Sequence, residues 1–212
     1  MPTAVIDAEG TEIFFTDSGP VEGSSDYTTY VMYHGSAFTG DMFHKLLPFA
    51  ANAKDNVRLV ILNRRDYVGS SKYSDAELED LNAGRKVFME RTAVEVGNFL
   101  AWFIEKNQIP RITSDGKSGG LAVGGWSIGS ATPLSLFGHP EAVPKELYAK
   151  LEPYFRLLIF YDPPHLTFGY EQPPEGYNPW TDPDFPTPLE LFDNFRYWVS
   201  GYYEHAGLPS RD

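Results

Sequence analysis

Residues 121–129 read LAVGGWSIG, and this stretch decides the fold. Residues 121–126 form a short apolar run of strand length, and residues 128–138 have helical spacing with small residues first. Between them, Gly125-Trp126-Ser127-Ile128-Gly129 matches the pattern G-x-S-x-G, which places a serine on a tight turn from strand to helix. Glycines at both ends of the pattern avoid a clash where the chain passes over itself. We interpret Ser127 as an exposed nucleophile; the alternative is a glycine-rich turn that caps an ordinary helix.

Strands and helices alternate on both sides of this turn. Apolar, β-branched runs predict strands, and apolar residues three and four apart predict helices between them. A strand at 11–16 with Val5-Ile6 as its hairpin partner precedes this alternation. Alternation of this kind predicts an α/β fold with a mostly parallel sheet and right-handed crossovers. The expected strands are 28–33, 57–62, 121–126 and 155–161, and the expected helices are 41–53, 85–107, 128–138, 144–152 and 189–205.

Composition narrows the class of protein. The 212 residues are 42% hydrophobic, which is enough for a core and excludes global disorder. A net charge of −12 repels phosphate backbones, so we expect no nucleic-acid partner. The absence of cysteine excludes disulfides, thiolate metal sites and cysteine nucleophiles. No apolar run approaches the roughly 20 residues of a membrane span, and no secretory signal is evident, so we expect a cytoplasmic protein.

A second motif lies at the end of the strand at 28–33. His34-Gly35-Ser36 occupies the place where G-x-S-x-G hydrolases carry a loop that supplies one oxyanion N–H. The residue after the nucleophile supplies the other, so the expected donors are the backbone N–H groups of Ser36 and Ile128. We expect His34 to be structural because it precedes the nucleophile, whereas the catalytic histidine of this arrangement follows it.

With these motifs the chain resembles the α/β-hydrolase fold, and more closely a set of fungal α/β-hydrolase-fold proteins. The resembling stretches are residues 33–36, 63–71 (NRRDYVGSS), 115–120, 124–129 and 161–164. The resemblance implies strands one to six of that fold, helices on both faces of the sheet, and a cap segment after the sixth strand. The resemblance implies that the charged residues of the 63–71 segment are mostly structural; the alternative is a role in substrate binding.

The acid and the base of a catalytic triad are harder to find. Only His139, His165 and His205 follow Ser127. His139 is expected to cap a helix end and His205 to face solvent. His165 lies at the carboxyl edge of the sixth strand, in a connection that does not usually carry the histidine. Asp162 directly follows that strand, where some members of the fold place the acid; its alternative role is a turn residue before Pro163-Pro164.

The length predicts an incomplete member of this fold. A βαβ unit takes about 30 residues or more, so the sequence after Asp162 has room for a cap but not for the last two strands and the histidine loop. We expect a hydrolase core at 1–162 and a Pro-rich and helical cap at 163–212. The sixth strand would then be an uncovered apolar edge, open to self-association.

The leading hypothesis is a serine hydrolase that cleaves an ester-type bond in a small apolar substrate. Trp126, His34 and Gly35 would contact the substrate, and Phe168, Tyr177 and Trp180 of the cap would help to shape an apolar pocket. Serine at 127 argues against the branches that use a carboxylate nucleophile, and we expect neither a metal nor a cofactor. The alternatives are a catalytically incompetent binding module and an incomplete gene product without a stable fold.

Overall fold

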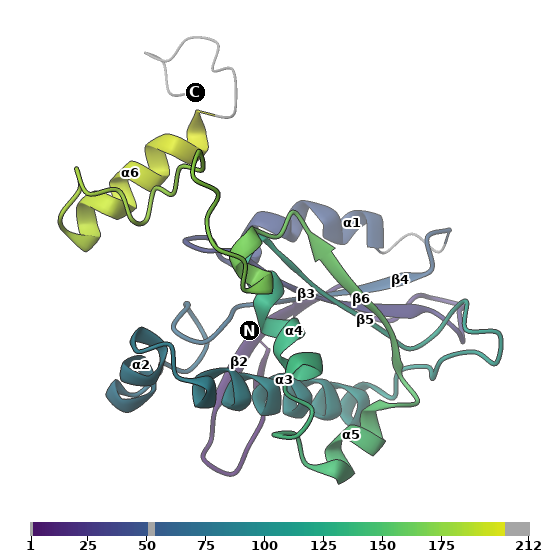
Figure 1. Cartoon of the computed structure of the whole chain (residues 1–212). Helices are drawn as coiled ribbons and strands as arrows, with labels where there is room; N and C mark the ends of the chain where they lie inside the picture. The colour runs from purple at the N-terminus through teal and green to yellow at the C-terminus, as the bar shows by residue number, and fades with distance from the viewer. Residues whose placement is uncertain (1, 51–53, 202–212) are drawn as a thin grey trace. The chain divides into compact units, whose positions relative to one another are not determined.

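The computed structural model describes residues 2–50 and 54–201. The chain divides into two compact units, Met1–Tyr170 and Glu171–Asp212. The first unit contains a six-stranded sheet in the order β1-β2-β4-β3-β5-β6 (Figure 1). Its strands are β1 (Thr3–Val5), β2 (Glu12–Asp17), β3 (Thr28–Tyr33), β4 (Val57–Leu62), β5 (Leu121–Trp126) and β6 (Phe155–Tyr161).

The sheet is mostly parallel, as the alternation of strands and helices predicts. Strands β4, β3, β5 and β6 run parallel to one another. β1 and β2 pair antiparallel, in agreement with the predicted hairpin, and β2 joins β4 antiparallel. The carboxyl ends of the four parallel strands therefore meet at one edge of the sheet, where they lead into the motifs at 34–36, 63–71, 127 and 162.

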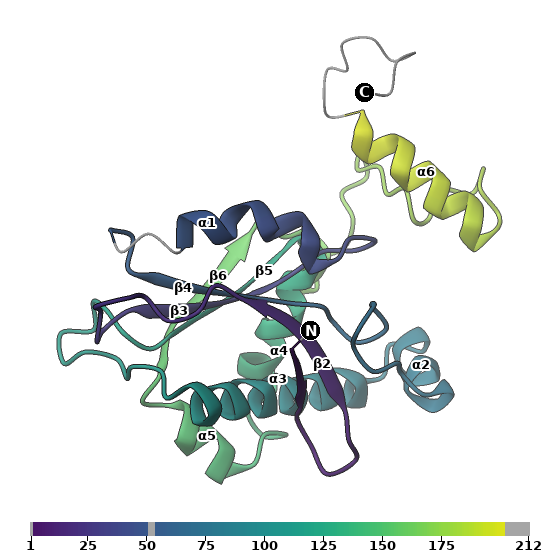
Figure 2. The same ribbon diagram turned by 180° about the vertical axis from the view of Figure 1, so that it is seen from behind.

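Helices cover both faces of this sheet. Figures 1 and 2 show α1 on one face and α3, α4 and α5 on the other. The long helix α3 begins and ends within one residue of the predicted 85–107. The predicted helix at 41–53 is a 3-10 turn followed by α1, and its last three residues lie outside the described part of the chain. The first-unit helices are η1 (Gly40–Leu46), α1 (Leu47–Ala50), α2 (Asp75–Asn82), α3 (Lys86–Asn107), η2 (Ser127–Ser130), α4 (Ala131–Gly138), α5 (Lys145–Leu151) and η3 (His165–Phe168).

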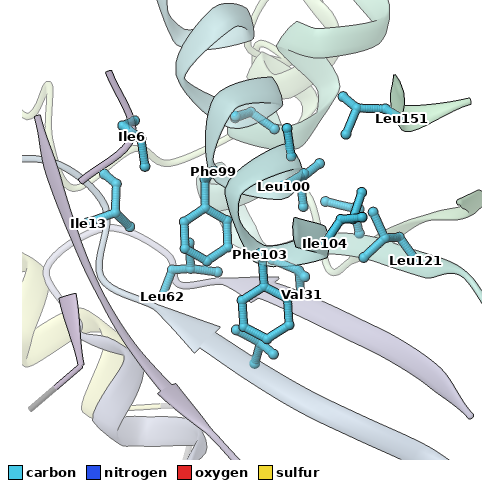
Figure 3. Close-up of a cluster of buried hydrophobic side chains, with 14 of the residues drawn as sticks. Ile6, Ile13, Val31, Leu62, Phe99, Leu100, Phe103, Ile104, Leu121 and Leu151 are labelled. Atoms are coloured by element: carbon cyan, nitrogen blue, oxygen red, sulfur yellow. The ribbon is translucent and has the colours of Figure 1, made fainter. Parts of the chain in front are cut away.

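The core lies between α3 and the sheet (Figure 3). Phe99, Leu100 and Phe103 on one face of α3 are almost completely buried. They pack against strand residues that include Val31 and Leu62, whose runs are apolar because helices cover both faces of a central parallel strand. Burial of side chains of this size stabilises the fold by roughly 1.5–3 kcal/mol each.

A single charged residue interrupts the apolar run of β4. Arg58 is buried, and its guanidinium donates to both carboxylate oxygens of Asp17, at 2.9 and 2.5 Å. It also donates to Asn107 Oδ1 at 2.7 Å, at the end of α3. Because a buried charge is tolerated only when it is paired and hydrogen-bonded, Arg58 connects the strand, its neighbour and the helix.

Hydrogen bonds join the loops at the amino ends of the parallel strands. Arg156 of β6 donates to the carbonyls of Gly119 and Lys117 and to Thr28 Oγ1, at 3.1, 2.9 and 2.6 Å. Ser118 donates to Asp26 at 2.8 Å. The turn at 115–120 thus holds the starts of β3, β5 and β6 together, as a structural turn.

The helix α2 is absent from the sequence prediction. Its N-terminus carries a capping box: Ser74 Oγ accepts the N–H of Glu77, and the Glu77 carboxylate accepts the N–H of Ser74. This S-x-x-E pattern is a readable helix start. The helix has no buried residue, which explains why it lacks the apolar periodicity of its neighbours.

The described part of the second unit, residues 171–201, contains a proline-rich loop and helix α6 (Pro188–Ser200). Thr187 and Glu190 form a capping box at the helix start. Trp180 of the loop stacks on Phe195 of the helix, with ring centroids 4.5 Å apart. The end of the predicted helix at 189–205, including His205, lies outside the described residues.

Candidate active site

Ser127 stands on a strained turn between β5 and η2. Its φ angle of 55° lies in the left-handed region, which few residues other than glycine adopt. The two glycines of the motif make the turn possible. A Cβ at Gly125 would lie 2.3 Å from the carbonyl oxygen of Gly129, and a Cβ at Gly129 would lie 2.1 Å from that of His34. The chain is therefore tightly crossed around the serine, and such strain is retained where the surrounding structure enforces it.

The loop after β3 passes directly beside this turn. A Cβ at Gly35 would lie 2.9 Å from the Trp126 ring and 3.1 Å from Ser127 Cβ. The segment after β4 holds this loop in place. Arg64 Nη2 donates to the Gly35 carbonyl at 3.0 Å, and the Tyr67 hydroxyl accepts the N–H of Ala37 at 3.2 Å. The sequence predicts a structural role for Arg64 and Tyr67. Both follow the carboxyl end of β4, and this position indicates that they lie near the serine.

His34 is completely buried, and both ring nitrogens have partners. Nδ1 donates to the Gly35 carbonyl at 2.8 Å, and Nε2 accepts the backbone N–H of Arg64 at 3.1 Å. This arrangement requires the neutral ring. Burial and, to a smaller extent, the positive charge of Arg64 lower the pKa of His34 from 6.5 to about 4, against the opposing effect of the Gly35 hydrogen bond. His34 thus supports the loop and is not available as a base near neutral pH.

This environment predicts a pH dependence of stability. Because the pKa of His34 is lower in the folded state, its contribution is fully present above pH 6.5 and is lost as the pH falls toward 4. We expect a loss of about 3 kcal/mol across this window, since one pKa unit corresponds to about 1.4 kcal/mol. Urea unfolding of the wild type and of His34→Asn, which keeps a donor near Gly35, measures the effect. The Asn variant should show a flatter pH profile; equal slopes would contradict the assignment.

A cavity of about 790 Å³ opens beside the serine turn. Ser36 and Ile128, the expected oxyanion donors, belong to its lining. So do polar residues of the loop after β4, among them Arg64 and Tyr67, and apolar residues of α3 and η3. A cavity of this volume lies within the range of small-molecule sites, which combine an apolar wall with a few polar groups.

A buried ion cluster forms part of the cavity wall. Arg65 is 8% exposed and donates to Glu77 and Glu95, with Nη1–oxygen distances of 2.7 and 2.6 Å. Burial raises the pKa of Glu95, and Arg65 acts in the opposite direction. Burial would also raise the pKa of Glu77, but hydrogen bonds from Arg65 and Ser74 outweigh it and lower that pKa to about 2. The cluster joins the loop after β4 to α2 and α3, and so fixes one side of the cavity.

The two candidates for the acid and the base of a triad, Asp162 and His165, are three residues apart in the sequence but differ in their exposure to solvent. Asp162 is exposed and has a φ of 48°, in the turn that follows the strand. His165 begins η3, which lies beside η2 and hence beside the serine turn. Its Nε2 is buried without a hydrogen-bond partner among the described residues. Among residues 2–50 and 54–201, the Ser127 hydroxyl makes no hydrogen bond to Asp162 or to His165.

The aromatic residues expected to shape a pocket lie in several places. Trp126 packs edge-on against Phe38 and Phe43, with centroids 5.4 and 6.1 Å apart, on the side of the sheet that faces α1. Phe168 contacts Phe160 of β6 at 5.2 Å. Tyr177 and Trp180 belong to the second unit.

One cluster of possible metal ligands occurs away from this edge. Ligand atoms of Glu90, His139 and Glu141 lie within 4.8 Å of one another. The ammonium group of Lys86 already contacts both glutamates, at 2.9 and 2.7 Å. Lys86 therefore supplies the positive charge that balances this cluster.

No protein-family model and no curated protein matches the chain. Solved structures do match it at low identity. Cfl2 from Burkholderia cenocepacia is 17% identical, with a TM-score of 0.53 over 94% of this chain and 56% of that one. An esterase from Exiguobacterium antarcticum is 18% identical, with a TM-score of 0.42 over 68% of this chain and 42% of that one. The epoxide hydrolase CorEH is 12% identical, with a TM-score of 0.48 over 94% and 51%.

These likenesses concern the fold. The six-stranded, mostly parallel sheet with helices on both faces is of the α/β-hydrolase type, which confirms the predicted fold class. The chain spans about half the length of these solved structures. Among residues 2–50 and 54–201, no helix is long and apolar enough to cross a bilayer.

Proposed function

We propose that the protein is a serine hydrolase that cleaves ester-type bonds in small molecules. Ser127 attacks the carbonyl carbon, and the backbone N–H groups of Ser36 and Ile128 bind the oxyanion that forms. The alcohol then leaves, and water cleaves the acyl-serine to release the acid. His165 is the proposed base and Asp162 the proposed acid, because both follow β6 at the edge of the sheet that carries the serine.

The strained serine carries this proposal. A φ of 55° at a non-glycine residue, enforced by two glycines that admit no Cβ, is costly and is typical of a nucleophile elbow. An ordinary helix cap does not need this geometry. Ser36 and Ile128 line the adjoining cavity, so a substrate bound there would lie next to this turn.

A fluorophosphonate probe tests the nucleophile. We expect the full chain to be labelled and Ser127→Ala to remove the labelling, because an unactivated serine reacts poorly with such probes. Ser135→Ala is the matched control: this buried α4 hydroxyl donates to the Thr132 carbonyl and should be dispensable. Absence of labelling in folded protein would overturn the proposal, as would labelling that survives Ser127→Ala.

One observation favours a second candidate, a binding module without catalysis. Among the described residues, His34 is committed to structural hydrogen bonds and the Ser127 hydroxyl has no histidine partner. On this alternative the cavity binds its ligand without turnover. Ligand binding combined with a complete absence of probe labelling would favour it over the hydrolase.

We also propose that β6 mediates self-association. It is the last strand in the sheet, and its Leu157, Phe160 and Tyr161 are 46%, 36% and 55% exposed. An exposed apolar edge strand is a template for pairing. Analytical ultracentrifugation should therefore show a larger species that grows with concentration, and Leu157→Lys should suppress it. A monomer at all concentrations would contradict the proposal.

A further inference from the structure

Arg64 is a cation in the cavity wall without a carboxylate partner. Within the described residues, no carboxylate oxygen lies within 4 Å of its guanidinium, whereas Arg58 and Arg65 are each ion-paired. Its Nη2 donates to the Gly35 carbonyl and to the Tyr67 hydroxyl, at 3.0 and 3.3 Å. Its Nε is buried and has no hydrogen-bond partner in the part of the chain that the structure describes. A buried, unpartnered donor is costly, so this one is suited to an acceptor that arrives with a ligand.

The position of Arg64 relates it to the proposed chemistry. Its guanidinium contacts the carbonyl of Gly35, and a Cβ added to that glycine would lie 3.1 Å from the Cβ of Ser127. The cation and the serine therefore both lie next to Gly35. A ligand with an anionic group a few bonds from a carbonyl carbon can contact both.

The other charged groups of the cavity wall already have partners or are exposed, so we expect an anion to bind at Arg64. Glu95 and Glu77 are bound to Arg65. Asp66 is exposed, and its Oδ1 accepts the N–H of Tyr73 at 2.9 Å. Thr167, buried in the same lining, has a hydroxyl without a partner among the described residues and offers a second hydrogen bond. Arginine recognises carboxylates well because its planar fork matches the two oxygens.

We propose that the cavity binds a carboxylate at Arg64 and that its substrates are half-esters of short dicarboxylic acids. The carboxylate-binding part stands on the geometry of Arg64; the ester part rests on the proposed hydrolase function. In the reaction, water adds across the ester, the alcohol leaves, and the product is the dicarboxylic acid. The free carboxylate only orients the acyl group and takes no part in bond making.

Calorimetry on full-length Ser127→Ala tests the carboxylate site without turnover. Monoethyl glutarate should bind at least tenfold more tightly than ethyl 5-methylhexanoate, a neutral compound of the same shape. Adding Arg64→Met should remove that difference, and Arg64→Gln, which keeps a donor for Gly35, should do so as well. The Gln variant decides the question if the Met variant fails to fold. Arg111→Met, whose guanidinium lies over the Tyr154 ring away from the cavity, is the matched control.

Equal binding of the two compounds, or binding unaffected by Arg64→Gln, would overturn the carboxylate site. This result is independent of the probe experiment. Monoethyl glutarate that binds through Arg64 without any serine labelling leaves the carboxylate site standing and rejects the hydrolase. Labelling of Ser127 without tighter binding of monoethyl glutarate supports the hydrolase and rejects the carboxylate site.

Discussion

Gly129→Ala is expected to destabilise the protein by about 3 kcal/mol, at the upper end of the usual cost of overpacking. The new Cβ would lie 2.1 Å from the carbonyl oxygen of His34, a distance that no side-chain rotation relieves because the obstacle is backbone. Either the loop after β3 or the serine turn must move. The midpoint of urea unfolding, interpreted at constant m-value, measures the loss.

Two further alanine variants sharpen this experiment. Gly125→Ala should be comparably damaging, since its Cβ would lie 2.3 Å from the carbonyl oxygen of Gly129. Gly138→Ala is the control: the glycine ends α4, and nothing lies within 4 Å of its Cβ position. A similar small effect for all three substitutions would show that the crossing at the elbow is looser than described.

Arg65→Met is expected to cost about 3–5 kcal/mol, the usual cost of removing one partner from a buried ion pair. The substitution leaves Glu77 and Glu95, which are 15% and 14% exposed, without their shared cation. Arg85→Met is the matched control, because Arg85 also binds two carboxylates but is 51% exposed. Exposed pairs contribute little, so the control should unfold close to the wild type. Equal losses for both variants would contradict the structural role of the cluster.

The cost of Arg65→Met should also depend on pH. Burial already raises the pKa of Glu95, and removal of the nearby cation raises it further. The unpaired carboxylate destabilises the variant only while it is charged. Lowering the pH from 7 toward 4 should therefore reduce the difference between variant and wild type. A difference that is constant with pH would mean that packing, not charge, accounts for the loss.

Much of the fold could be predicted because each element carries its own local signal. β3, β4, β5 and β6 begin and end where their apolar runs do. The serine turn could be predicted for the same reason, because the two required glycines and the serine lie within five consecutive residues. The helix α2 was missed because its signal is a capping box and not apolar periodicity.

The contacts around the serine could not be predicted from local sequence patterns. Arg65 meets Glu77 and Glu95 across 12 and 30 residues, so no local pattern joins them. Tyr67 supports Ala37 from 30 residues away. Whether a given arginine is paired, as Arg65 is, or free to bind a ligand, as we propose for Arg64, follows only from the three-dimensional arrangement.

The hydrogen bonds of Arg156 at the amino ends of the strands have a consequence for how this protein can change. At that end Arg156 joins the starts of three strands, whereas at the cavity end Arg64 Nε and Thr167 Oγ1 are buried and have no hydrogen-bond partner among the described residues. The hydrogen bonds of Arg156 and the proposed Arg64 site thus lie in different loops, about one strand length apart. A substitution of Arg64 can therefore alter what is bound and leave the hydrogen bonds that join the strand starts intact, whereas the neighbouring Arg65 is needed for stability.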